Sequence, residues 1–305
     1  MLLRALRSSI PVARNAATTG GFPVVRRIWI AEVHEPITDD LPDIAWCCGG
    51  WRTIVVFVAD TWFDAWVAER YEELWPELFD PAILSPAVDF LAELAGNRPA
   101  LEFGIGTGRI AVPLAERGVA VQGIELSPAM AARIAGYPNA SDVKVTIGDF
   151  ATTEVGARFG LVYLVRNTIT NLTTQREQVA AFRNAAAHLQ PGGHFVIENY
   201  VPQLRRLPPG ETTCVFASTP THLGFEEYDV AAQIAVSRHI WTQGSDVRTF
   251  ASPHRYVWPA ELDLMAELAG MTLRERWADW SRGPFTSESR GHISVWQQTV
   301  SGSDR

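Results

Sequence analysis

The 305-residue sequence has few cysteines and no long apolar run. Its three cysteines, Cys47, Cys48 and Cys214, form an odd set without metal-ligand spacing, so we predict neither a disulfide framework nor a metal site. The longest unbroken apolar run, residues 54–59, is far shorter than the roughly 20 residues that cross a membrane. These absences predict a protein without membrane contacts in a reducing, cytoplasmic setting.

Lysine is also scarce, because Lys144 is the only one, and the 34 acidic residues outnumber the 26 basic ones to give a net charge of −8. A nucleic-acid partner favours a basic groove that offsets its phosphates, so we expect no nucleic-acid substrate. The chain is long enough for one large α/β domain or two small ones. Nothing in the composition predicts an oligomeric state.

Residues 1–60 differ from the rest of the chain. Five arginines precede the first acid, Glu32, and prolines and glycines interrupt any helical period. We predict an N-terminal extension that is poorly ordered or non-catalytic, followed by a catalytic domain over residues 61–300. A targeting segment, a mis-assigned start and an ordered functional cap remain alternatives for the extension.

The most informative stretch is residues 101–110, which read LEFGIGTGRI. A predicted helix precedes it, with Ser85 at the N-cap, Pro86 at the first helical position and Gly96 past the end. A second helical stretch follows and stops at Gly118. We therefore predict a buried strand, a glycine-rich turn and a helix, an arrangement that brings bare backbone N–H groups against a ligand.

The glycine spacing decides between two kinds of ligand. Gly104 and Gly106 fit the dinucleotide fingerprint, but its third small position is occupied by Arg109, which disfavours a nicotinamide-dependent oxidoreductase. The third glycine is instead Gly108, and Glu102 lies two residues before the first. This pattern resembles the first motif of the class I S-adenosylmethionine-dependent methyltransferases. A turn that merely bends the chain is the alternative.

Further strand ends extend the resemblance. Residues 119–125 read as a strand whose last residue, Glu125, lies 21 positions past Gly104, near the spacing at which an acid meets a ribose. Its carboxylate can accept hydrogen bonds from both ribose hydroxyls. After a third strand, residues 143–147, the resemblance implies that Asp149 faces the adenine amine and Phe150 the ring.

Ahead of the core, Tyr71 matches a tyrosine that covers the cofactor in such enzymes, although packing on the core explains it equally well. The resemblance implies S-adenosyl-L-methionine as cofactor, with this binding set: Tyr71, Glu102, Gly104, Gly106, Gly108, Glu125, Leu126, Met130, Asp149, Phe150 and Leu164.

The fourth strand, residues 159–165, is apolar throughout, and its carboxyl end is where a doubly wound sheet places a ligand. Asn167 and Asn171 follow it and are candidates for the acceptor side, although turn formation also explains them. Arg166 stands where relatives carry an apolar or aromatic residue. This departure leaves open a non-catalytic S-adenosylmethionine-binding protein.

Residues 194–198 read as the fifth strand, and residues 212–257 interrupt the alternation with strand-like runs at 233–241 and 247–256. Such an insertion resembles the cap of small-molecule N-methyltransferases, including bacterial amino-sugar N-methyltransferases. Tyr228 and Trp241 in this cap are candidates for the acceptor pocket. A final helix and two strands, residues 271–280 and 292–299, complete the chain.

The predicted fold is α/β, a doubly wound, Rossmann-like, seven-stranded sheet with one antiparallel strand and an antiparallel β cap insertion. The predicted function is in-line methyl transfer to nitrogen or oxygen of a small molecule. Orientation alone supplies much of this catalysis, so no catalytic residue is predicted. An oxygen acceptor would need a base, for which His222, His239, His254 and His292 are available.

Overall fold

The computed structural model describes residues 28–32, 53–57, 63–138 and 140–299, which divide into two units. In the first unit, Met1–Thr61, strands β1 (Ile28–Glu32) and β2 (Thr53–Phe57) pair in antiparallel fashion. The remaining expectations for residues 1–60 fall outside the described residues. Within the described ranges, no helix is long and apolar enough to cross a membrane.

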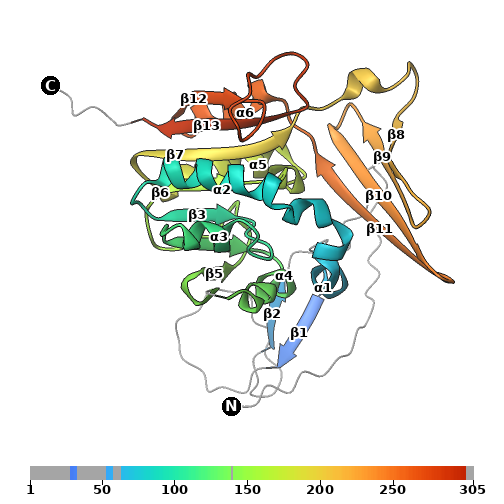
Figure 1. The fold of residues 1–305 in the computed structure, drawn as a ribbon, viewed down its shortest axis with the longest axis horizontal. Coiled ribbons are helices and arrows are strands. Elements are labelled where there is room, and N and C mark those ends of the chain that lie inside the picture. The colour runs from blue at the N-terminus through green and yellow to red at the C-terminus, as the bar shows by residue number, and fades with distance from the viewer. Residues whose placement is uncertain (1–27, 33–52, 58–62, 139, 300–305) are drawn as a thin grey trace. The chain divides into compact units, whose positions relative to one another are not determined.

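The second unit, Trp62–Arg305, is built on a seven-stranded sheet in the order β12-β13-β7-β6-β3-β4-β5 (Figure 1). Neighbouring strands from β7 through β5 run parallel, whereas β13 is antiparallel to both β7 and β12. The predicted sheet with one antiparallel strand is therefore confirmed. Its strands are β3 (Ala100–Phe103), β4 (Val121–Glu125), β5 (Lys144–Ile147), β6 (Phe159–Leu164), β7 (Leu189–Tyr200), β12 (Met271–Trp277) and β13 (Gly291–Gln298).

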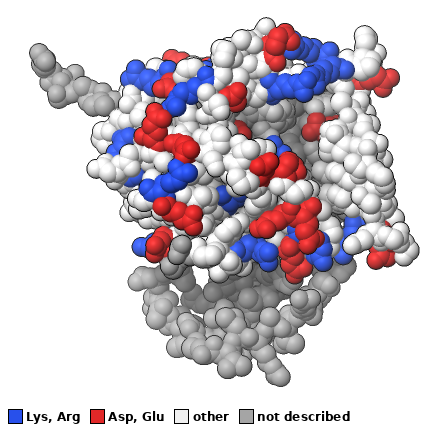
Figure 2. All heavy atoms as spheres, in the orientation of Figure 1, with Lys and Arg blue, Asp and Glu red and all other residues white. Residues whose placement is uncertain are grey.

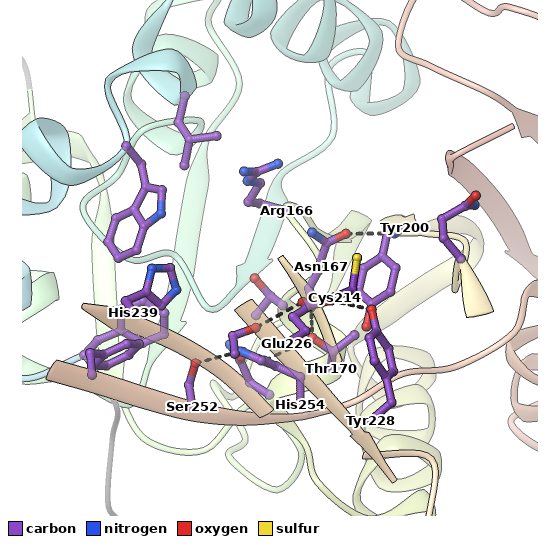
Figure 3. Close-up of a pocket in the computed structure, with 18 of the residues that line it drawn as sticks. Arg166, Asn167, Thr170, Tyr200, Cys214, Glu226, Tyr228, His239, Ser252 and His254 are labelled. Carbon is purple, nitrogen blue, oxygen red and sulfur yellow. Dashed lines mark hydrogen bonds between the residues drawn. The ribbon is translucent and has the colours of Figure 1, made fainter. Parts of the chain in front are cut away.

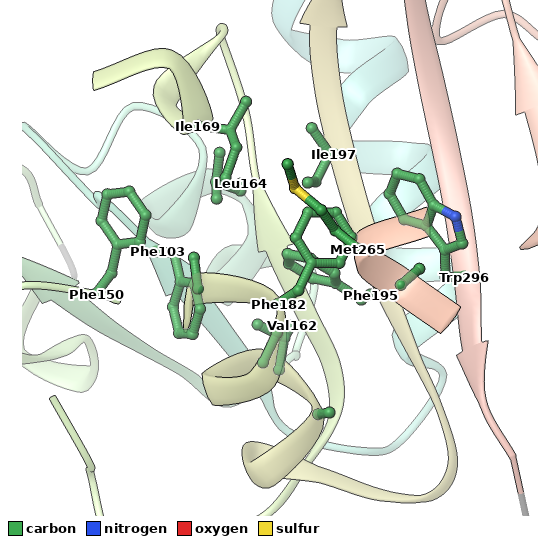
Figure 4. Close-up of a cluster of buried hydrophobic side chains, with 14 of the residues drawn as sticks. Phe103, Phe150, Val162, Leu164, Ile169, Phe182, Phe195, Ile197, Met265 and Trp296 are labelled. Carbon is green, nitrogen blue, oxygen red and sulfur yellow. The ribbon is translucent and has the colours of Figure 1, made fainter. Parts of the chain in front are cut away.

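Two apolar clusters cover the faces of this sheet. One includes Phe182 and Met265 from α5 and α6, packed on Phe103 and Phe195 of the sheet (Figure 4). The other includes side chains of α2 and α3. Burial on both faces explains why the central strand β6 is apolar throughout. The helices are α1 (Ala65–Leu74), α2 (Pro81–Ala95), α3 (Ala111–Glu116), α4 (Pro128–Arg133), α5 (Gln175–His188) and α6 (Pro259–Leu268).

Short 3-10 turns connect several of these elements. They are η1 (Pro76–Phe79), η2 (Ile134–Gly136), η3 (Ala140–Asp142), η4 (Thr168–Asn171) and η5 (Leu204–Arg206). On the face that Figure 2 shows, acidic and basic side chains are interspersed, and acidic ones gather over α1.

The predicted start of the first core helix is wrong. Helix α2 begins at Pro81, and Asp80 is its N-cap, with Oδ1 accepting a hydrogen bond from the N–H of Ala82 at 2.8 Å. Asp80 and Pro81 form as good a start signal as Ser85 and Pro86, and Pro86 lies inside the helix, where it removes one hydrogen bond. Two other helices begin at typical N-cap residues: Ser127 caps α4, and the Thr174 capping box opens α5.

The cap is a separate four-stranded antiparallel sheet in the order β11-β10-β9-β8. The predicted hairpin is confirmed, with only Gly244 and Ser245 outside the ladder between β10 (Ile234–Gln243) and β11 (Asp246–Arg255). Strands β8 (Thr213–Ser218) and β9 (His222–Asp229) add a second hairpin. In β8 and β9 the alternation between apolar and polar residues is weak, because the face of the cap that lines the pocket carries polar and aromatic side chains.

Buried Arg255 anchors the end of the cap to the core. Its guanidinium donates to Gln178 of α5 at 2.5 Å, to Gln233 at 2.9 Å and to Glu261 of α6 at 2.7 Å. Burial raises the pKa of Glu261, but hydrogen bonds from Arg255, Gln175 and Gln233 outweigh that effect and lower it. This buried guanidinium is paired with Glu261 and hydrogen-bonded to two glutamines, so it fixes where the end of β11 meets the core.

Candidate active site

The glycine-rich turn between β3 and α3 needs its glycines for their backbone conformation. Gly104, Gly106 and Gly108 have φ values of 68°, 58° and 82°, a region that side chains other than glycine rarely adopt. A Cβ on Gly104 would also lie 2.6 Å from Cγ2 of Thr168, so this glycine lets η4 approach closely. A Cβ on Gly106 would lie 3.6 Å from Cε of Met130, an ordinary van der Waals contact, so the positive φ is what favours glycine at this position.

Most N–H groups of this turn are already hydrogen-bonded within the protein, which corrects the expectation that they are bare. Those of Gly104 and Ile105 donate to the carbonyl of Ile124, and that of Gly108 donates to the carbonyl of Ile105. Helix α3 begins only at Ala111 and has six residues. The turn therefore shapes the site rather than offering a row of free donors.

Glu125, at the carboxyl end of β4, lies directly beside this turn. It is only 7% exposed, and its two oxygens accept from the N–H groups of Gly106 at 2.9 Å and Ser127 at 2.8 Å. Burial raises its pKa, and the backbone hydrogen bonds oppose that rise. A carboxylate has about four acceptor positions, so two remain for hydroxyl groups of a ligand. This geometry fits the two ribose hydroxyls of the predicted cofactor.

The other predicted cofactor residues lie in two environments. Asp149 follows β5 at the same sheet edge, is half-buried, and accepts from the N–H of Ala151 at 2.8 Å with one oxygen. Met130 is buried against Gly106, and Leu126 is half-buried. By contrast, Phe150 and Leu164 are core side chains, as Figure 4 shows. The Phe150 ring stacks on Phe103 at 5.6 Å, and Leu164 is 0% exposed.

Glu102 lies beneath the turn and is 2% exposed. Burial raises its pKa to about 8, although the Tyr163 hydroxyl donates to its Oε2 at 2.9 Å. The nearby Arg109 also opposes the rise, and its guanidinium donates to the carbonyl of Leu78 in η1 at 3.2 Å. Arg109 thus ties η1 to the turn, which accounts for an arginine where dinucleotide-binding folds carry a small residue.

A pocket of about 470 Å³ lies between this sheet edge and the inner face of the cap (Figure 3). Four predicted residues line it: Tyr71, Asn167, Asn171 and Tyr228. Trp241 does not line it, because its ring stacks on His222 and His239 and packs against aromatic side chains of α1 and its C-cap. The remaining lining residues are Phe63, Trp75, Leu78, Arg166, Thr168, Thr170, Tyr200, Gln203, Arg206, Leu207, Cys214, Glu226, Ser237, His239, Phe250, Ser252 and His254.

The wall formed by the end of β6 is strained. Arg166 and Asn167 have φ values of 54° and 59°, and left-handed residues other than glycine cost about 1–3 kcal/mol each. Strand β7 holds them in place: Glu198 accepts from the N–H of Arg166 at 2.7 Å, and Tyr200 donates its N–H to Oδ1 of Asn167 at 2.8 Å. The guanidinium of Arg166 lies 3.9 Å from Glu77. Asn167 therefore fixes the turn as well as lining the pocket.

Of the four candidate histidine bases, two line the pocket. Burial, with a smaller effect of His222 and His254, lowers the pKa of His239 to about 4, and burial lowers that of His254 to about 4. His254 lies 2.8 Å from the Ser252 hydroxyl. Both imidazoles are thus neutral at pH 7. His222 and His292 lie outside the pocket lining.

Sequence reasoning missed several of these side chains. Tyr163 lies in β6 and Glu198 in β7, and the largely apolar sequences of these strands give no sign of a functional side chain. Glu226, Ser237 and Ser252 lie on three cap strands at facing register positions. The only local signal is that polar residues interrupt each strand on one face. Among the described residues, no group of three or more metal-ligating side chains is suited to a metal ion.

The comparisons with known proteins agree with this geometry. Residues 100–193 match the family model of a methyltransferase domain. The cypemycin N-terminal methyltransferase of a Streptomyces species is 26% identical over 239 residues, which are 74% of this chain and 96% of the relative. The structure of the CcbJ methyltransferase from Streptomyces caelestis is 37% identical with a TM-score of 0.68, covering 76% of this chain and 96% of that chain. CalS10, an amino pentose methyltransferase from Micromonospora echinaspora, is 22% identical with a TM-score of 0.56, covering 75% and 96%.

The doubly wound sheet, the glycine turn and the acid at the end of β4 together define a class I S-adenosylmethionine-dependent methyltransferase. The identity to the CcbJ methyltransferase, over nearly all of that protein, carries the assignment to a family. The chain belongs to the S-adenosylmethionine-dependent methyltransferases, in the branch that acts on small molecules, and its cofactor is S-adenosyl-L-methionine.

Proposed function

We propose that this enzyme methylates a nitrogen atom of a small-molecule amine held in the pocket under the cap. One observation carries the choice of nitrogen over oxygen: both histidines that line the pocket have a pKa of about 4. A hydroxyl acceptor needs a base that works near neutral pH, whereas a neutral amine attacks with its own lone pair. Burial also raises the pKa of Tyr71, Tyr200 and Tyr228, so these lining phenols stay protonated.

A curated relative supports the same choice. The cypemycin enzyme is named for methylation of an N-terminus, and it aligns with 74% of this chain. The pocket here holds about 470 Å³, a volume suited to a small molecule. We therefore propose an amine acceptor of metabolite size.

The cofactor, when bound, supplies a methyl group already activated on a sulfonium. In this proposal Glu125 accepts hydrogen bonds from the ribose hydroxyls, and Asp149 accepts one from the adenine amine. Tyr71 contacts Phe63, Trp75 and Phe79, forming an aromatic wall that excludes water. Holding two reactants in line in such an enclosure lowers a barrier by up to ~7–11 kcal/mol.

The test measures transfer of label from methyl-labelled S-adenosylmethionine to matched small amines and alcohols. We expect label in amines only. Label confined to alcohols would contradict nitrogen methylation, and efficient labelling of tRNA or rRNA would contradict a small-molecule acceptor. Binding of S-adenosylmethionine without transfer to any of them would favour the non-catalytic alternative, and NAD binding would revive the oxidoreductase alternative.

A further inference from the structure

The inner face of the cap is divided into a polar half and an aromatic half. Strand register places Cys214, Glu226, Ser237 and Ser252 side by side in one row across the four strands. The next row holds Gly224, His239 and Phe250. Figure 3 shows His239 at one end of the pocket and Tyr228 at the other, with Glu226, Ser252 and His254 between them.

The aromatic half is packed for a flat or apolar group. A Cβ on Gly224 would lie 2.3 Å from the Phe216 ring, so the absence of a side chain at Gly224 leaves room for that ring. The ring of His239 has its centroid 5.2 Å from Phe216, 5.7 Å from Phe250 and 6.2 Å from Trp75. Three of these rings, Trp75, His239 and Phe250, line the pocket, and edge-to-face aromatic contacts of this kind favour an apolar partner.

The polar half is centred on one carboxylate. Ser237 donates its hydroxyl to Oε1 of Glu226 at 3.1 Å, and Tyr228 donates its hydroxyl to Oε2. These two bonds fix the orientation of the carboxylate and leave acceptor positions free. Burial, followed by the charge of Glu226, raises the pKa of the neighbouring Tyr200.

This carboxylate has no cationic partner in the described part of the chain. None of the eight ion pairs there includes Glu226, although Arg166 and Arg206 line the same pocket. Arg166 is instead 3.9 Å from Glu77. Two hydroxyl donors hold this half-buried carboxylate, but no cation in the described part of the chain offsets its charge, and Glu226 lines the pocket.

We infer that Glu226 binds the amino group of the acceptor and that the acceptor is an amine carrying an aromatic or apolar group, which packs on the aromatic half. This inference rests on the proposed nitrogen methylation and adds the residue that recognises the amine and the class of its substituent. Nitrogen donors suit the free oxygens of Glu226, because hydrogen bonds to a charged acceptor are the strong kind.

The experiment uses benzylamine and its isostere benzyl alcohol as probes. Binding to the full chain saturated with S-adenosylhomocysteine is followed by ligand-observed NMR for the wild type, Glu226→Gln and Glu227→Gln. Glu227 is the matched control, since it lies on the other face of β9 and pairs with Arg238. We expect benzylamine to bind the wild type more tightly than benzyl alcohol. Glu226→Gln should weaken benzylamine about 10- to 150-fold, the range for a charged hydrogen bond, and leave benzyl alcohol unchanged.

The aromatic half is tested with 2-aminoethanol, which lacks a ring. It should bind the wild type more weakly than benzylamine, and Phe250→Ala should narrow that difference. A wild type that fails to bind benzylamine, or that binds 2-aminoethanol equally well, overturns the assigned acceptor class.

Equal effects of Glu226→Gln on benzylamine and benzyl alcohol, or no effect, overturn the role of Glu226. Affinity for S-adenosylhomocysteine reports whether each variant is folded, and the amine-to-alcohol difference in the wild type tests the carboxylate even if Glu226→Gln does not fold. Label transfer separates the two proposals: transfer to amines that is unchanged in Glu226→Gln contradicts this inference alone, whereas transfer only to alcohols contradicts nitrogen methylation.

Discussion

The proposed cofactor side and the proposed acceptor side of this enzyme are built in different ways. On the proposed cofactor side, the candidate residues lie at three strand ends, each a short contiguous segment: the glycine turn after β3, Glu125 on β4 and Asp149 after β5. On the acceptor side, side chains come from α1, the end of β6, β7 and all four cap strands. The cofactor site is thus encoded by local motifs, and the acceptor site by the register of distant strands.

The two sides also respond to burial in opposite ways. Burial raises the pKa of the acids Glu102 and Glu125 on the cofactor side. It lowers the pKa of His239 and His254 on the acceptor side. In each case a low-dielectric environment disfavours the charged form. Neutral imidazoles therefore line the pocket, and acids with raised pKa values lie beside the glycine turn.

The largest expected effect is that of removing the cap, which should abolish methylation but not cofactor binding. We expect that replacing residues 213–254 with a short Gly-Ser linker abolishes methylation of the acceptor, because the cap supplies Glu226 and the rings of His239 and Phe250. Affinity for S-adenosylhomocysteine should change only a few-fold, since Arg255 and the glycine turn are kept. Calorimetry and label transfer measure the two quantities. A folded variant that methylates its acceptor at the parent rate would place the acceptor elsewhere.

The converse change is Glu125→Ala, which addresses the cofactor side alone. Loss of a charged acceptor should cost about 1.5–3 kcal/mol of cofactor binding, or roughly 10- to 150-fold in affinity for S-adenosylmethionine and S-adenosylhomocysteine. Glu116→Ala, at the exposed end of α3, is the matched control. Unchanged affinity of Glu125→Ala in calorimetry would remove this residue from the site.

The contrast in burial should appear in the pH dependence of stability. Glu102 has a pKa of about 8 when folded against 4.5 as its ordinary value, so the folded state binds more protons and stability falls as pH rises from about 4.5 to 8. His254 has a pKa of about 4 against 6.5, so the unfolded state binds more protons and stability falls as pH drops from 6.5 to about 4.

Each group contributes a slope of at most about 1.4 kcal/mol per pH unit. The free energy of unfolding is measured by urea unfolding at several pH values. We expect Glu102→Gln to reduce its fall between about pH 4.5 and 8 as pH rises, and His254→Gln to reduce its fall between pH 6.5 and about 4 as pH drops. Two variants with the same profile as the wild type would show that neither pKa is shifted in the folded protein.

The smallest expected effect is that of the N-terminal segment. We propose that a shortened chain starting at Val56 folds and binds S-adenosylhomocysteine as the full chain does, because residues 1–60 lack the periodic pattern of the core and the described strands there form a separate unit. Circular dichroism and calorimetry test this. Failure to fold, or a clear loss of affinity, would make the segment a structural part of the enzyme.

Several parts of the structure follow from short stretches of sequence. The strand, glycine turn and helix predicted around residues 101–110 are confirmed. The Ser127 cap and the Thr174 capping box are likewise set by residues three positions apart. The start of α2 shows the limit of such signals. Asp80 with Pro81 and Ser85 with Pro86 are equivalent start signals, and packing of the whole helix decided between them.

The sequence by itself determined three things: the class of fold, the strand that leads into the glycine turn, and the identity of the cofactor. Each depends on residues within a few positions of one another. Only the tertiary structure decided that Glu226 faces the pocket while Trp241 turns into an aromatic stack. Both are polar or aromatic residues on neighbouring strands of one sheet, and their surroundings depend on strand register and on which helix packs against the sheet. Contacts between residues distant in sequence set those features, so no local pattern encodes them.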